Sequence, residues 1–138
     1  MNWTRFILAA AGGVVVMCGL HFVWHAPLFG NFYLEQNAAI RTPEIAVPVI
    51  FLAEAIRSLV LAFIYPFGYK GGAPAMEGVR FGVLMGLFSA MPLLIYVGRY
   101  NYSSFTWFWV EGLFFVIQGA IAGIVIAYIH GTGAGKAS

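Results

Sequence analysis

The chain is poor in charged residues and in cysteine. Only 9% of its 138 residues are charged, whereas a soluble domain has about 25%. This shortage, with a 62% hydrophobic composition, excludes a water-soluble globular protein and indicates an integral membrane protein surrounded by the lipid bilayer. The few basic residues form no cluster, which argues against a nucleic-acid partner. A single cysteine cannot form an intramolecular disulfide.

Long apolar runs occupy most of the chain. Hydropathy and the positions of proline and glycine predict four transmembrane helices, at about residues 4–25, 43–67, 77–98 and 105–130. Because the connections are short, we expect an all-α polytopic membrane protein with its helices in an up-down bundle, forming one domain over residues 1–138. The first run is longer than the apolar part of a signal peptide, so we interpret it as a retained span.

Helix breakers set the expected boundaries. Pro27 is predicted to end the first span, because the residue before a proline disfavours helix, and 28–41 is predicted to be a loop. Thr42 and the proline after it are typical of a helix start. Pro66 is predicted to close the second span, and Pro92 to kink the third.

Basic residues in the connections predict the orientation. The N-terminal side carries Arg5, Lys70, Arg80 and Lys136, and the opposite side carries Arg41 and Arg99. Since cytoplasmic loops are enriched in lysine and arginine, both termini are predicted to be cytoplasmic. The pattern of 59–65 resembles that of 124–130, which indicates two helical hairpins related as a parallel repeat.

Small residues recur at every fourth position in the last two spans. Gly78, Gly82 and Gly86 lie on one face of the third span, and Gly119 and Gly123 lie on one face of the fourth. Such spacing lets helix backbones approach closely in lipid. We therefore expect the third and fourth spans to pack tightly together. A homodimer face is the alternative interpretation.

Five polar side chains within the predicted spans form a candidate polar cluster. Glu54, Arg57 and Gln118 are expected near the bilayer centre, and Glu111 and His21 about 10 Å towards the outer side, at about 1.5 Å of helix per residue. The structural interpretation is a network in which Glu54 neutralises Arg57, Gln118 satisfies the remaining donors and His21 binds Glu111. The functional interpretation is a proton or ligand site in which Glu111 and His21 titrate.

A metal or haem site is a further hypothesis. Cys18, His21 and His25 lie on one face of the first span, and Glu111 could complete a shell for copper or zinc. The motif is unspecific, so no cofactor is predicted outright. No nucleophile–base arrangement is present in the sequence pattern, and we do not expect an enzyme.

Aromatic residues crowd the outer ends of the spans. They are expected to form an interfacial belt, with a partner surface as the alternative. The group comprises Trp24, Phe29, Phe32, Tyr33, Tyr96, Tyr100, Tyr102, Trp107 and Trp109.

Three motifs carry a resemblance to a known group of proteins. They are 24–30 (WHAPLFG), 77–82 (EGVRFG), and Gln118-Gly119 followed by Gly123. In these positions the chain resembles small four-helix bacterial membrane proteins classed as domains of unknown function. The resemblance implies the same fold and a bacterial cytoplasmic membrane, and it implies no activity.

Two functional classes follow. In the first, the protein is an accessory or assembly subunit that docks onto other membrane-protein subunits, or onto a second copy, through aromatic outer loops and small-residue faces. In the second, it is a minimal proton-coupled carrier or sensor that uses Glu54, Arg57, Glu111 and His21. Short loops leave little room for gating, which favours the subunit.

Overall fold

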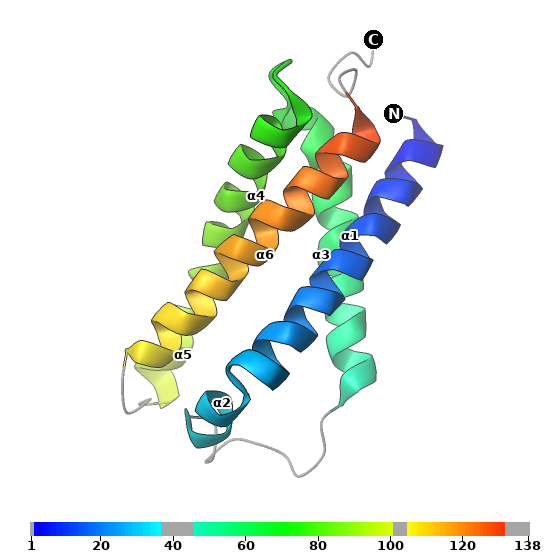
Figure 1. The fold of residues 1–138 in the computed structure, drawn as a ribbon. Helices are drawn as coiled ribbons and strands as arrows, with labels where there is room; N and C mark the ends of the chain where they lie inside the picture. The colour runs from blue at the N-terminus through cyan, green and yellow to red at the C-terminus, as the bar shows by residue number, and fades with distance from the viewer. Residues whose placement is uncertain (1, 37–45, 101–104, 132–138) are drawn as a thin grey trace.

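The computed structural model describes residues 2–36, 46–100 and 105–131, and its described elements are all helices (Figure 1). Four described stretches are long and apolar enough to cross a membrane. The prediction of a small, all-α, four-helix membrane protein is confirmed. The elements are α1 (Trp3–Val23), a π-helical turn η1 (Trp24–Leu28), α2 (Gly30–Gln36), α3 (Val47–Gly68), α4 (Pro74–Ala90), α5 (Leu93–Tyr100) and α6 (Thr106–His130).

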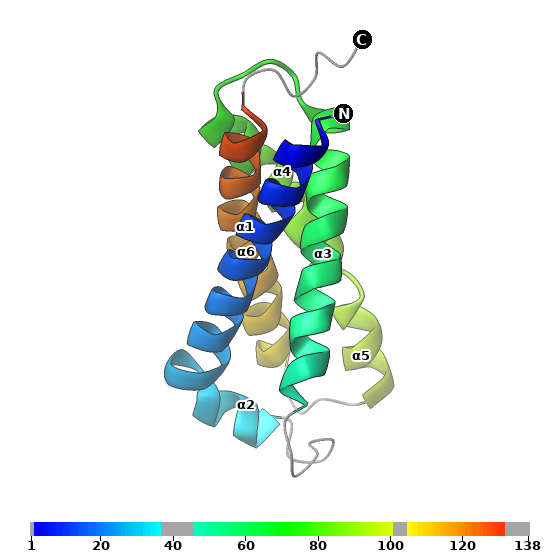
Figure 2. The same ribbon diagram turned by 90° about the vertical axis from the view of Figure 1, so that its right-hand side faces the viewer.

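Helix α6 lies between two partners. It packs against α4 on one side and against α1 on the other, and α1 packs against α3. Helix α3 also packs against α6, whereas α3 and α4 touch only briefly (Figure 2). In Figure 1, α3 runs behind α6 and α1. The start of α1 and the end of α6 lie together at what we call the termini end, and α2 and α5 lie at the opposite, distal end (Figure 1). The side of the membrane that each end faces remains a prediction.

Two arginines hold the helix ends at the termini end. Arg5 NH1 donates to the carbonyl oxygen of His130 at 2.7 Å, and Arg80 NH2 donates to the carbonyl oxygen of Gly68 at 2.9 Å. The last carbonyl groups of a helix have no partner within the helix and carry partial negative charge. Each guanidinium group therefore caps the C-terminus of a neighbouring span, α6 in the first case and α3 in the second.

Prolines shape the distal end. Pro27 lacks an N–H group, and around it the helix widens to a five-residue turn in which the Phe29 N–H donates to the Trp24 carbonyl oxygen at 3.0 Å. The third span is interrupted at Pro92, where a kink is predicted: α4 ends at Ala90 and α5 begins at Leu93. The second span runs two residues beyond Pro66, which therefore does not end it.

One prediction at the distal end is wrong in part. The sequence predicts a loop over 28–41, but Gly30–Gln36 within it form α2. This helix is short, and it is held by burial of Tyr33 against Trp107 and Phe108 of α6 rather than by a long apolar stripe. The helix start expected at Thr42 lies outside the described residues.

Helices α4 and α6 meet backbone to backbone. A Cβ atom on Gly82 would lie 2.0 Å from the carbonyl oxygen of Gly119, and one on Gly78 would lie 2.6 Å from that of Gly123. A Cβ atom on Gly86 would likewise lie 2.5 Å from a carbonyl oxygen of α6. The predicted close packing of the third and fourth spans is therefore present. The five glycines are used inside the chain, which leaves none of them for a homodimer face.

The α1, α3 and α6 helices enclose the main apolar core. Small residues of α1 let α3 approach, and the Ser58 hydroxyl group donates to the Ala10 carbonyl oxygen at 2.7 Å. The two predicted hairpins correspond to α1 with α3 and α4 with α6, and their relation as repeats stays a prediction. The buried members of this core are Ala9, Ala10, Met17, Leu61, Ala62, Tyr65, Ala122, Ile126 and Ala127.

Candidate functional site

A hydrogen-bonded group lies at the middle of α3 and α6. Arg57 NH1 donates to Glu54 Oε2 at 2.8 Å and to Gln118 Oε1 at 2.9 Å. Gln118 Nε2 donates to Glu54 Oε1 at 3.1 Å and to the Met17 carbonyl oxygen at 3.0 Å. The guanidinium group also lies over the Phe115 ring, 4.7 Å from its centre. The structure thus brings together the three central residues that the sequence indicated.

His21 lies beside this central group. Its Nδ1 is 2.9 Å from Glu54 Oε1, so the predicted contact between His21 and Glu111 is wrong. A depth counted from residue numbers assumes that the spans are parallel and that each side chain lies level with its own backbone. It is His25, one turn further along, that reaches Glu111.

His25 reaches Glu111 by folding back along α1. Its Nδ1 lies 3.0 Å from the carbonyl oxygen of His21, within the widened turn at Pro27. This contact moves the ring towards the bilayer centre, and its Nε2 lies 3.1 Å from Glu111 Oε2. The π-helical turn, which hydropathy does not predict, therefore builds this second carboxylate–imidazole pair.

Tyr33 completes the distal side of the site. Its hydroxyl group donates to Glu111 Oε2 and accepts a hydrogen bond from Trp24 Nε1 at 3.1 Å. Burial raises the pKa of Tyr33, and the charge of Glu111 raises it further. The phenol therefore stays protonated and acts as a donor. The sequence predicts that Tyr33 belongs to the interfacial belt, and its inward position depends on the helix α2, which the sequence does not indicate.

The two histidine rings join the two carboxylates. The rings of His21 and His25 are stacked with centres 4.2 Å apart and planes 21° apart. Phe114 packs edge-on against both rings. A continuous series of contacts therefore runs from Arg57 at the centre to Tyr33 at the distal end. We call this series the polar core: Arg57, Glu54, Gln118, His21, His25, Glu111 and Tyr33.

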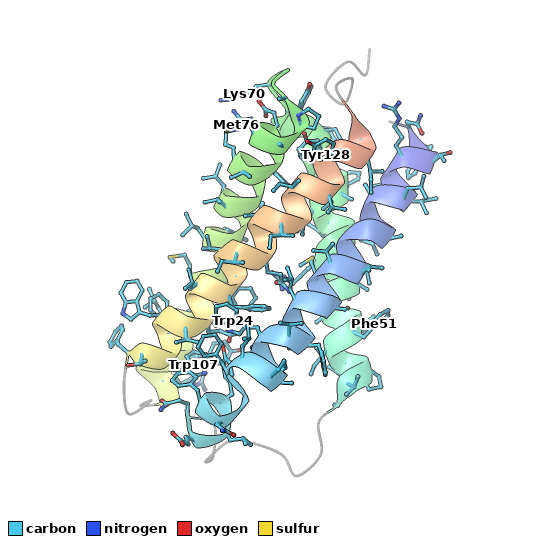
Figure 3. The ribbon with its side chains drawn as sticks, viewed as in Figure 1. Trp24, Phe51, Lys70, Met76, Trp107 and Tyr128 are labelled. Carbon is cyan, nitrogen blue, oxygen red and sulfur yellow. The ribbon has the colours of Figure 1, made fainter. Side chains whose placement is uncertain are left out.

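The side chains of the polar core are mostly covered by protein, but several keep part of their surface exposed. The Glu54 side chain is 4% exposed and that of Glu111 is 12% exposed. The side chains of His21, His25 and Arg57 keep between 22% and 26% of their surface. Figure 3 shows the aromatic side chains Trp24 and Trp107 within the distal end of the bundle, whereas Phe51 on α3 points away from it.

The metal hypothesis gains no support from the geometry. In the described part of the chain, no three His, Cys, Asp or Glu side chains are placed so that they could hold a metal ion. Cys18 shares a helix with His21 and His25, but the two histidines turn to different carboxylates. The hydrogen bonds of both rings account for their positions without a metal.

Only some of the aromatic residues predicted to form an interfacial belt are exposed. Tyr33 and Trp107 are buried, and Trp24 is half-buried, whereas Tyr96 and Trp109 are exposed. The sequence could not separate the two groups, because aromatic side chains at a span end fit both an interface and a packed cap.

The chain was compared with known proteins. No protein-family model, curated protein or solved structure matches it. The resemblance noted in the sequence therefore remains an expectation.

Proposed function

We propose that the protein is a minimal proton-linked carrier or sensor, in which the polar core takes up and releases a proton within the membrane. One observation carries this proposal: two carboxylate–imidazole pairs lie in contact with one another inside the spans. Ionisable side chains are costly in a bilayer, and where they occur they commonly mark proton or ion pathways.

A purely structural role requires fewer residues. Glu54, Arg57 and Gln118 already satisfy one another and tie α3 to α6 and α1. Removing the His25–Glu111 pair would leave that network intact. A second ionisable pair, about 10 Å further along the α6 axis at about 1.5 Å per residue, adds cost without being needed for the first. A role in proton exchange explains why the chain carries this second pair.

The test is proton flux in vesicles. Purified protein is reconstituted with a pH-sensitive dye inside, and a pH step is applied across the membrane. We expect Glu111→Gln to lower the protein-dependent flux on the order of 100-fold, as loss of a positioned proton-transfer group does. Glu35→Gln, which alters an exposed carboxylate on α2, is the matched control and should leave the flux unchanged. Equal flux in wild type and Glu111→Gln would contradict the proposal.

A role as an accessory or assembly subunit is the second candidate. It is favoured by large aromatic side chains left exposed at the distal end: Tyr96 at 49%, Phe105 at 58% and Trp109 at 68%. The glycine faces do not support it, because α4 and α6 use them on each other. Purification in a mild detergent tests this candidate. Stoichiometric membrane partners that are lost on Trp109→Ala would support it, and a lone protein with Glu111-dependent flux would refute it.

A further inference from the structure

We infer that the exchangeable proton of the polar core lies between His25 Nε2 and Glu111 Oε2, and that Glu54 is a permanently ionised partner of Arg57. This inference rests on the proposed function and assigns its proton to one of two carboxylates. It also replaces His21, the histidine that the sequence indicated, with His25.

The partners of His25 fix its tautomer. A carbonyl oxygen can only accept, so the Nδ1 that faces the His21 carbonyl oxygen at 3.0 Å must carry hydrogen. In a neutral ring Nε2 is then a bare lone pair. It faces Glu111 Oε2 at 3.1 Å, and this oxygen is also an acceptor when the carboxyl group is ionised. Two acceptors at this distance require one proton between them, on Nε2 or on Oε2.

Tyr33 cannot supply that proton and remain a phenol. Its hydroxyl hydrogen is directed at the same Oε2 of Glu111, and its oxygen accepts from Trp24. The pair therefore needs one proton beyond those of a neutral imidazole and a carboxylate. That proton can leave, because the side chains of His25 and Glu111 are 22% and 12% exposed.

Both carboxylate oxygens of Glu54 already face hydrogen-bond donors. Its Oε1 accepts from Gln118 Nε2 and faces His21 Nδ1, and its Oε2 accepts from Arg57. Three donors fill the carboxylate, and one of them is permanently positive. A proton added to Glu54 would break a contact with Arg57 or with His21. Protonation is therefore directed to Glu111.

The surroundings limit the site to one proton. Within the described residues, the titratable and charged groups around the pair are His21 on α1, Tyr33 on α2, and Glu54 and Arg57 on α3. His21 is stacked on His25 at 4.2 Å, so two imidazolium rings would repel each other. When the shared proton leaves to water at the distal side, the lone pair of Nε2 and the carboxylate repel.

The test is nuclear magnetic resonance on full-length protein with ¹⁵N-labelled histidine in lipid, titrated across neutral pH. Wild type suffices, because the chain has three histidines and single His→Asn variants are needed only for assignment. We expect His25 Nε2 to lose its proton while His21 keeps hydrogen on Nδ1 throughout. Infrared difference spectra should show a carboxyl–carboxylate change that disappears in Glu111→Gln and persists in Glu54→Gln.

The outcomes separate this inference from the proposed function. Titration of His21 with a silent His25, or a carboxyl signal that persists in Glu111→Gln, would overturn the inference even if proton flux is observed. Titration of His25 with no flux in vesicles would support the proton assignment and refute the carrier. If Glu54→Gln does not fold, the wild-type histidine spectra still decide between His25 and His21.

Discussion

Helix α6 meets α4 through bare backbone and meets α1 and α3 through hydrogen-bonded side chains. On the α4 side, a Cβ atom added to Gly82 would lie 2.0 Å from a carbonyl oxygen. On the other side, Gln118 bridges a carboxylate, a guanidinium group and the Met17 carbonyl oxygen. In lipid, no hydrophobic force draws apolar helices together, so both interfaces need another source of attraction.

The difference separates a fixed interface from an adjustable one. Backbones in direct contact have no side chain that can rotate or change charge, so α4 and α6 are expected to move as one unit. The interface with α1 depends on groups that can exchange a proton, and its distal part includes a π-helical turn, a feature that often marks functional positions. We therefore expect motion to occur between α1 and the α4–α6 pair.

The largest effect is expected from filling the backbone contact. Gly82→Leu must separate α4 from α6, and we expect a loss of stability greater than the about 3 kcal/mol that overpacking usually costs. Gly19→Leu is the matched control, because a Cβ atom on Gly19 would meet nothing within 4 Å. Unfolding in mixed micelles, followed by circular dichroism, measures both. Equal stability of the two variants would show that the backbone contact does not hold the fold.

An intermediate effect is expected from breaking the central ion pair. Arg57→Leu leaves Glu54 as a buried charge without its counterion, and we expect it to cost about 3 kcal/mol. The double variant Glu54→Leu/Arg57→Leu removes both charges and should cost less than the single change. Arg99→Leu alters an exposed arginine on α5 and should be neutral. If the double variant costs the sum of its two single changes, the pair is not coupled.

The glycine interface could be predicted from sequence and the polar core only in part. The spacing of Gly78, Gly82 and Gly86 is a local pattern, which helical geometry converts directly into a face. The central contacts of Glu54 followed from helical spacing and depth. The partner of Glu111 did not, because it depends on a π-helical turn and on a ring folded back along α1.

Tyr33 shows a second limit of the sequence. Its segment is short and aromatic, and nothing local distinguishes a seven-residue helix that covers the bundle from a loop at the membrane surface. Its burial is decided by Trp107 and Phe108, which are more than 70 residues away in the chain. Pairings of this kind are set by tertiary packing, and helical spacing carries no information about them.

The smallest effects on stability are expected from removing the hydroxyl groups of two buried tyrosines, Tyr33 and Tyr65. Tyr33 donates to Glu111, whereas the hydroxyl group of Tyr65 has no hydrogen-bond partner in the described structure. Removing a hydroxyl group that is satisfied costs about 1 kcal/mol, and removing one that is buried without a partner is neutral or stabilising. We therefore expect Tyr33→Phe to destabilise the protein by about 1 kcal/mol and Tyr65→Phe to leave it unchanged or slightly more stable.

The dependence of stability on pH gives a second test of Tyr33. The folded-state pKa of Tyr33 is raised by burial and by Glu111, so its contribution to stability is complete below the unfolded-state pKa of about 10. The contribution is lost as the pH rises from there through the higher folded-state pKa, because the unfolded chain releases the phenolic proton first. Wild type should thus lose stability relative to Tyr33→Phe above about pH 10. If the stabilities of the two proteins change in parallel at alkaline pH, Tyr33 is not the buried donor to Glu111. Another group would then have to donate to Glu111 at the distal end of the polar core.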